Sequence, residues 1–338
     1  MDARADARSG LAVLLAPVSV GEFLSIHWLN RFAFCRGPAT RFASLLSWTE
    51  LNTILEHHWR ETFRFRLALR GRDLDPASYA DLGGSAPRIR SRDVTDHLRR
   101  GATLSFDAID EVHEPLTRLA ESFEASFHAG TQINIYAGWR TQHGLDLHCD
   151  DQEVFILQLE GRKRWLLYGH SIDGVDRSRL ASQSEPPGGA ALDQILERGD
   201  LLYIPRGCYH VALPMNEPTL HLTVSVKTES DVKPRPSFSL PWSATPELLP
   251  PGRGFTVQMS GRSEAASNGS GPGAYELRLG GRTFRFPSGM QWIVEQLADG
   301  SARPFSDIVD GLAGRLDEEM IRLLVGMLVK QNLIEIRQ

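Results

Sequence analysis

The stretch at 147–150, Leu-His-Cys-Asp, constrains this chain most, because it places two metal-ligating residue types two positions apart. Side chains two apart on a strand point to the same side, so His148 and Asp150 on a strand present an imidazole and a carboxylate to one point. The apolar run 154–157 and the basic run from 162 indicate a strand, a turn and a returning strand. Two histidines and one carboxylate form the facial triad that holds Fe(II) in non-haem oxygenases. The stretch therefore predicts a β-rich fold with two of three metal ligands, although His-x-Asp alone is more often a solvated strand surface.

A second segment supplies the third ligand. Residues 199–210 read Gly-Asp-Leu-Leu-Tyr-Ile-Pro-Arg-Gly-Cys-Tyr-His, which indicates a short apolar strand, a Pro-x-Gly turn and a histidine entering the next strand. The turn suits a ligand held across a barrel from His148. We therefore predict that His148, Asp150 and His210 bind the metal and form the catalytic centre. His221, on a later strand, is the alternative imidazole, and we expect it to be a hydrogen-bonded residue of the barrel instead.

These two segments resemble the JmjC-type cupin oxygenases, most closely the ribosomal oxygenase (cupin-4) group. The resemblance includes Val-Phe-x-Leu-Gln-x-x-Gly-Arg-Lys-Arg-Trp at 154–165 and covers about residues 20–228. It implies a mainly β fold with flanking helices, built on a double-stranded β-helix (the cupin or JmjC jelly roll). It also implies a dioxygenase that uses Fe(II), 2-oxoglutarate and O2 to hydroxylate a side chain of a protein or peptide.

The resemblance also indicates residues that bind the cosubstrate. Lys163 stands where the family carries the Lys or Arg for the distal carboxylate of 2-oxoglutarate, although its spacing alone favours a solvated basic turn. Asn134 and Tyr136 match an Asn-x-Tyr of a pocket-lining strand, and Thr223 is a further candidate. For Tyr136, a barrel-core tyrosine with a satisfied hydroxyl is the competing interpretation. Arg162 and Arg164 are expected on the opposite face of the strand from Lys163.

Three other functions compete with hydroxylation of a polypeptide. The substrate of such a hydroxylase is alternatively small and amino-acid-like, or a natural product. The barrel is alternatively a non-catalytic cupin that serves as a regulator or binding module. The complete His-Asp-His set and Lys163 favour an enzyme.

Composition limits the partners and the compartment. The net charge of −5 provides no electrostatic basis for binding nucleic acid. No apolar run reaches membrane-spanning length, and the mixed charges of the first eight residues argue against a signal peptide. The three cysteines form no CxxC pair, which favours a reducing, cytoplasmic location. A homodimer is one option for the oligomeric state.

Composition also predicts the domain organisation. We expect a leader over residues 1–20, a JmjC-type domain with N-terminal helices over 21–230, and a Pro/Gly/Ser-rich linker over 231–273. From 274 to 338, a hairpin, three helices and a closing strand predict a small winged-helix-like domain. Its acidic and basic residues nearly balance, so we expect it to dock a protein or peptide rather than DNA.

Overall fold

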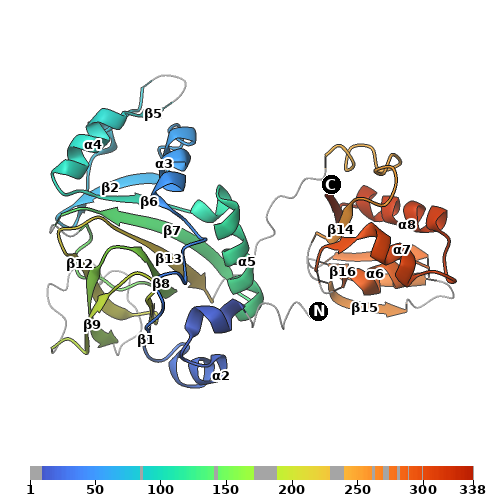
Figure 1. Ribbon diagram of the computed structural model, residues 1–338, viewed down its shortest axis with the longest axis horizontal. Helices are drawn as coiled ribbons and strands as arrows, with labels where there is room; N and C mark the ends of the chain where they lie inside the picture. The colour runs from blue at the N-terminus through green and yellow to red at the C-terminus, as the bar shows by residue number, and fades with distance from the viewer. Residues whose placement is uncertain are drawn as a thin grey trace. The chain divides into compact units, whose positions relative to one another are not determined.

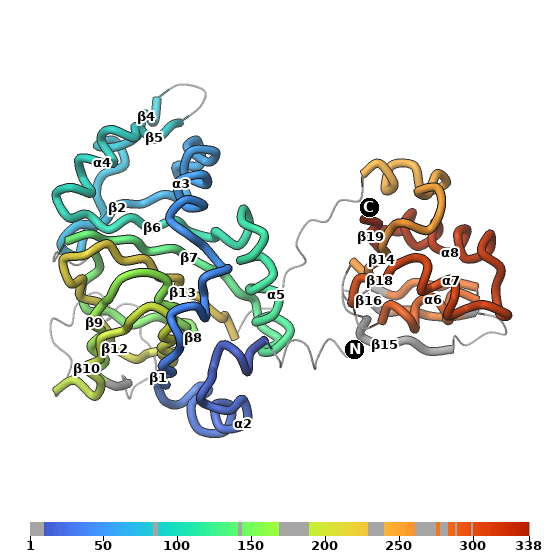
Figure 2. Tube along the Cα trace, viewed as in Figure 1, coloured from blue at the N-terminus to red at the C-terminus, as the bar shows by residue number. Residues whose placement is uncertain are grey.

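The chain divides into two compact units, Asp6–Val232 and Lys233–Gln338, in this computed structural model. We call them the barrel unit and the C-terminal unit (Figure 1, Figure 2). No helix of the described residues is long and apolar enough to cross a membrane. The structure describes residues 10–83, 87–140, 144–170, 189–228, 240–260, 263–268, 274–279, 282–287, 289–298 and 300–337.

An eight-stranded antiparallel sheet forms the larger layer of the barrel unit. Its central strand β8 is buried along almost its whole length, because both faces of the sheet are covered. This explains why the sequence there is continuously apolar instead of alternating. The strands in spatial order are β1 (Ala33–Cys35), β11 (Leu201–Ile204), β8 (Glu153–Glu160), β13 (Thr219–Lys227), β7 (Gly130–Gly138), β6 (Thr103–Phe106), β2 (Phe65–Leu69) and β3 (Arg72–Asp73).

A three-stranded sheet forms the second layer, in the order β10 (Leu192–Leu196), β9 (Lys163–His170) and β12 (Cys208–Pro214). Val154 and Ile156 of β8 share one buried cluster with Trp165 and Leu167 of β9. The two sheets therefore pack against each other through alternate residues of their strands. This is the double-stranded arrangement that the sequence predicted, and the mainly β fold class is confirmed.

Helices cover the other face of the larger sheet (Figure 1). α5 (Glu114–Phe127) buries Leu116, Leu119, Ala120 and Phe123. The ring of Phe123 packs edge-on against that of Phe155 in β8, with 4.9 Å between the ring centroids. α3 (Trp48–His57) begins with a capping box of Ser47 and Glu50. The remaining helical elements of this unit are α2 (Val20–Glu22), η1 (Phe23–His27), η2 (Pro76–Ser78), α4 (Ser91–Arg99) and η3 (Ile109–Glu111), and a short hairpin pairs β4 (Ala80–Asp81) with β5 (Arg88–Ile89).

The predicted leader is wrong for residues 10–20. Residues 10–15 are helical, and Leu11, Leu14 and Leu15 are buried in the main core of the barrel unit. Their spacing places the three leucines on one helical face, and burial of this face ties the helix to the core. Residues 1–9 lie outside the described residues.

The C-terminal unit has its own apolar core. The predicted helices and closing strand are present, while the predicted turn at 280–281 lies outside the described residues. The winged-helix assignment stays a prediction. The elements are β14 (Thr256–Met259), β15 (Ser263–Asn268), β16 (Ala274–Leu279), β17 (Arg282–Pro287), α6 (Met290–Leu297), β18 (Arg303–Pro304), α7 (Phe305–Gly311), α8 (Glu318–Lys330) and β19 (Ile334–Arg337), with sheets β18-β14-β19 and β15-β16-β17.

The structure also differs from the predicted linker over 231–273. β14 pairs with β19, and Phe255, Val257 and Met259 are buried in the C-terminal core. Residues 263–268 form β15, which pairs with β16. The alternation of Phe255, Val257 and Met259 marked a half-buried strand, but the Pro- and Gly-rich sequence on either side concealed it. Residues 231–239, 261–262 and 269–273 of this predicted linker lie outside the described residues.

Candidate metal centre and pocket

The structure brings His148, Asp150 and His210 together. Each offers one ligand atom, and these atoms lie within 4.8 Å of one another. The Nε2 atoms of His148 and His210 are 4.0 and 3.7 Å from the two carboxylate oxygens of Asp150. The two imidazole nitrogens and the carboxylate approach a common point from the same side. This matches the facial arrangement that the spacing predicted.

Backbone pairing sets this geometry. His148 and His210 form an isolated antiparallel bridge, with N–H···O distances of 3.2 and 2.8 Å in the two directions. Gly207, at φ 78°, closes the Pro-x-Gly turn and donates its N–H to the carbonyl of Asp150 at 2.9 Å. Two details therefore differ from the prediction. His148 lies in a single bridge rather than a regular strand, and His210 lies beside it rather than across a barrel.

Hydrogen bonds orient both histidine rings. The Nδ1 of His148 lies 2.8 Å from the carbonyl of Asp146, and the Nδ1 of His210 lies 2.9 Å from that of Cys208. A carbonyl only accepts, so each Nδ1 carries the proton and each Nε2 is left with a lone pair facing Asp150. Burial, together with neighbouring His148, lowers the pKa of His210 to about 4, so its ring is neutral at pH 7.

A cavity of about 330 Å³ opens beside the three side chains, between the two sheets. Three cross-strand pairs of β7 and β13 face it: Tyr136 with His221, Asn134 with Thr223, and Gln132 with Ser225. The ring of His221 stacks on that of Tyr136 at 5.3 Å. His221 lies outside the metal cluster, as expected. Its Nδ1, however, is buried without a hydrogen-bond partner among the described residues, which differs from the predicted hydrogen-bonded residue.

Lys163 projects into this cavity from β9 and is only 5% exposed. Burial lowers the pKa of its ammonium to about 8, because no carboxylate of the described residues pairs with it. Arg164, one position on, is exposed and bonds Asp193 at 2.6 Å, and Arg162 bonds Glu217 at 3.1 Å. The side chain of Lys163 is therefore the one of these three that faces the cavity, as the alternation predicted.

The remaining predicted cosubstrate residues, Tyr136, Asn134 and Thr223, also line the cavity. Burial raises the pKa of the Tyr136 phenol to about 12, so it stays protonated and able to donate. Asn134 Oδ1 accepts from the backbone N–H of Ala108 at 2.9 Å and from the Gln132 amide at 3.0 Å, which fixes its orientation. The structure thus gathers the four predicted cosubstrate residues around one cavity.

Sequence reasoning missed several residues that line the cavity. Trp165 shares the face of Lys163, and the Lys-x-Trp alternation was a usable signal for it. Its indole Nε1 is buried without a partner among the described residues. Arg66 reaches the cavity from β2, which joins the sheet only through β6. No local pattern reveals such a long-range neighbour.

Comparison with known proteins shows what a part of the chain resembles. Residues 110–233, which include all three candidate ligands, match the JmjC domain family. Over this part, the chain is similar to a JmjC domain. Its sequence relatives include the bifunctional lysine-specific demethylase and histidyl-hydroxylase NO66 of Drosophila grimshawi, 29% identical over 228 residues. They also include ribosomal oxygenase 2 of Rattus norvegicus, 37% identical over 220 residues.

These alignments cover 64% and 63% of this chain but only 30% and 46% of the two relatives. Among solved structures, the ribosomal oxygenase YcfD of Escherichia coli is similar with a TM-score of 0.55 and 18% identity, over 95% of this chain and 99% of that one. A YcfD structure in complex with cobalt and 2-oxoglutarate matches with a TM-score of 0.53. At this identity the structural likeness supports the fold around the JmjC domain.

Proposed function

We propose that this chain is an Fe(II)- and 2-oxoglutarate-dependent dioxygenase that hydroxylates a side chain of a protein or peptide. The arrangement of His148, Asp150 and His210 carries the proposal. Both rings are held through Nδ1 by backbone carbonyls, which leaves both Nε2 positions toward Asp150, so the donor set suits a divalent first-row metal. With iron, 2-oxoglutarate and O2 bound, the centre inserts one oxygen atom into a C–H bond and converts 2-oxoglutarate to succinate and CO2.

The cavity fits a dicarboxylic cosubstrate. A buried ammonium without a counter-ion is costly, and a carboxylate beside Lys163 would remove that cost. The unpartnered Nε1 of Trp165 and Nδ1 of His221 lie in the same cavity wall. Lys163 would bind the distal carboxylate, and the protonated phenol of Tyr136 would donate a hydrogen bond to the bound acid. Asn134 and Thr223 would complete the polar wall.

Polypeptide substrates are favoured by the relatives. NO66 is described as a lysine-specific demethylase and histidyl-hydroxylase, and the others are ribosomal oxygenases. We propose that the C-terminal unit recruits the polypeptide and takes no part in the chemistry. Neither nucleic acid nor a membrane is proposed as a partner.

Succinate formation tests the function. The full chain, loaded with Fe(II) under reducing conditions, is supplied with 2-oxoglutarate and candidate polypeptides, and succinate and substrate mass are followed. We expect succinate in step with a mass gain of one oxygen atom. A cupin that only binds would yield no succinate with any candidate. Succinate without an oxygenated polypeptide, but with an oxygenated small molecule, would favour a small substrate.

A further inference from the structure

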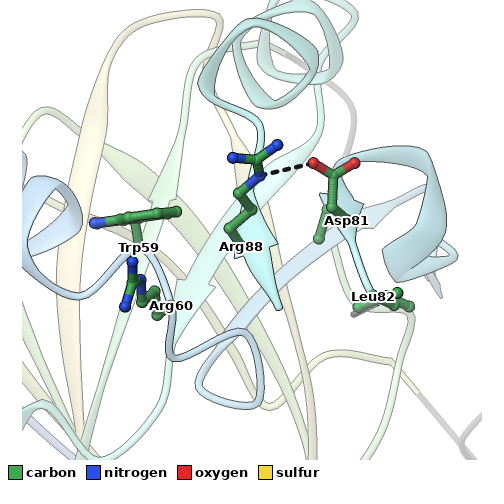
Figure 3. Close-up of a pocket in the computed structure, with 7 residues that line it drawn as sticks. Trp59, Arg60, Asp81, Leu82 and Arg88 are labelled. Atoms are coloured by element: carbon green, nitrogen blue, oxygen red, sulfur yellow. Dashed lines mark hydrogen bonds and ion pairs between the residues drawn. The ribbon is translucent and has the colours of Figure 1, made fainter. Parts of the chain in front are cut away.

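A second hollow lies in the barrel unit away from the metal centre, and we call it the Trp59 pocket (Figure 3). Its volume is about 600 Å³, and it shares no lining residue with the cavity beside the metal centre. The lining comes from the segment after α3 and from the β4–β5 hairpin. The residues are Trp59, Arg60, Ala80, Asp81, Leu82, Gly83 and Arg88.

Ion pairs and backbone pairing hold the walls of this pocket in place. The N–H of Ile89 donates to the carbonyl of Trp59 at 2.9 Å, which ties the hairpin to the segment after α3. Asp81 and Arg88 are cross-strand partners, joined at 2.9 Å, as Figure 3 shows. Asp81 also pairs with Arg90 at 2.8 Å. The one carboxylate that lines the pocket is thus shared by two guanidinium groups.

Arg60 differs from these arginines. Its guanidinium lies over the indole of Trp59, 4.8 Å from the ring centroid, and no carboxylate of the described residues forms an ion pair with it. Stacking on an aromatic face holds the guanidinium in one orientation while leaving its N–H groups free to donate. Leu82, on the other side of the pocket, is 51% exposed. The pocket therefore combines an uncommitted cation with an apolar surface.

We propose that the Trp59 pocket binds an acidic peptide segment that carries an aromatic or apolar side chain. Carboxylates of the segment would bind Arg60 and also Arg88, whose partner Asp81 is shared with a second arginine. The apolar side chain of the segment would pack on Trp59 and Leu82. The inference rests on the proposed function, because such a segment belongs to a polypeptide substrate, outside the residue that is hydroxylated.

Fluorescence anisotropy tests this without any chemistry. The probe is the labelled peptide Glu-Asp-Phe-Glu-Asp, titrated with metal-free full chain in the absence of 2-oxoglutarate. We expect saturable binding that weakens with salt, because the contacts are exposed. Arg60→Gln should weaken it about fivefold, as for a good exposed ion pair, and Trp59→Ala about tenfold. Arg99→Gln is the matched control, since Arg99 is an exposed arginine of α4 whose side chain is 73% exposed.

Three results would overturn the proposal. Equally tight binding of the neutral peptide Gln-Asn-Phe-Gln-Asn would remove the charge argument. Unchanged binding by both Arg60→Gln and Trp59→Ala would place the peptide elsewhere. Tighter binding of a single-stranded oligouridylate at this pocket would assign it to nucleic acid. Because the metal-free protein is used, none of these results bears on succinate formation, so the two proposals fail separately.

Discussion

The barrel unit and the C-terminal unit bury different kinds of side chain. Among the described residues, the fully buried polar or charged side chains other than tyrosines lie in the barrel unit, including Lys163, His210 and His221. The C-terminal unit is packed around an apolar cluster of α6, α7, α8 and the sheet β18-β14-β19. Burying a polar group costs free energy unless a partner compensates it. The concentration of such groups in one unit therefore marks where a polar ligand is expected.

The C-terminal unit differs by exposing large apolar side chains on its surface. Met320, Leu323 and Met327 of α8 are 42%, 59% and 36% exposed. Their spacing of three and four places them on one helical face. A unit with an apolar core and an apolar outer face is suited to contact with another polypeptide rather than to chemistry. Chemistry is therefore expected in the barrel unit, and recruitment is proposed for the C-terminal unit in addition to the Trp59 pocket.

Removing a metal ligand should have the largest effect. His210→Ala or Asp150→Ala leaves two donors of the three that face one point, so we expect loss of Fe(II) binding and of succinate formation. Equilibrium dialysis measures the metal, and turnover assays measure succinate. His57→Ala, at an exposed position of α3, is the control and should behave like the unchanged chain. Full activity in either variant would show that the substituted residue is not a metal ligand.

Lys163→Ala should have the next largest effect. It removes the buried ammonium proposed to bind the distal carboxylate, so the requirement for 2-oxoglutarate should rise by about one to two orders of magnitude, roughly 1.5–3 kcal/mol. Arg164→Ala is the matched control, because that side chain is exposed and paired with Asp193. Steady-state kinetics at varied 2-oxoglutarate gives the comparison. An effect of Arg164→Ala with none of Lys163→Ala would show that the cosubstrate contacts the opposite face of β9.

The buried Lys163 also predicts a pH dependence of stability. Its pKa is about 8 in the folded chain and 10.5 in the unfolded one, so between these values the unfolded chain binds more protons. The free energy of unfolding of the metal-free protein should therefore rise between about pH 8 and about pH 10.5, by a contribution on the order of 3 kcal/mol. Urea unfolding measures it. Lys163→Met should lack this rise, and an equal rise in both proteins would contradict a buried, unpaired ammonium.

The sequence predicted the metal-centre residues and the strands of the barrel because their information is local. His148 and Asp150 stand two apart, and the Pro-x-Gly turn before His210 requires the positive φ of Gly207. The apolar run 154–157 lies within β8, and the short apolar strand predicted within 199–210 is β11. Periodicity and turn chemistry act over a few residues, so one sequence is enough to read them.

Long-range neighbours were not predictable in this way. Arg66 enters the cavity wall only because β2 pairs with β6, and β6 with β7. The direct bridge between His148 and His210 joins segments about sixty residues apart in the sequence, and no local pattern shows it. The same holds for β14, whose partner β19 lies near the far end of the C-terminal unit. These features depend on which strands pair, and pairing follows from the packing of the whole unit.

Removing residues 233–338 should have the smallest effect on turnover by the barrel unit. The two units have separate apolar cores, and none of the residues that line the metal-centre cavity comes from the C-terminal unit. We therefore expect the shortened chain to fold, to bind Fe(II), and to form succinate without substrate at close to the rate of the full chain. Hydroxylation of a polypeptide should weaken through KM more than through kcat, because the reacting centre is intact.

Two measurements judge this last prediction. Circular dichroism of the shortened chain reports folding, and an unfolded barrel unit would make the C-terminal unit a structural part of the barrel. Steady-state kinetics with a polypeptide that the full chain hydroxylates reports recruitment. An unchanged KM for this substrate would remove that role from the C-terminal unit. Leu323→Ser on the exposed face of α8 is a more specific test than removal of the whole unit, because it alters the outer face and leaves the apolar core in place. If recruitment uses this face, KM should rise about fivefold, which corresponds to about 1 kcal/mol of lost contact.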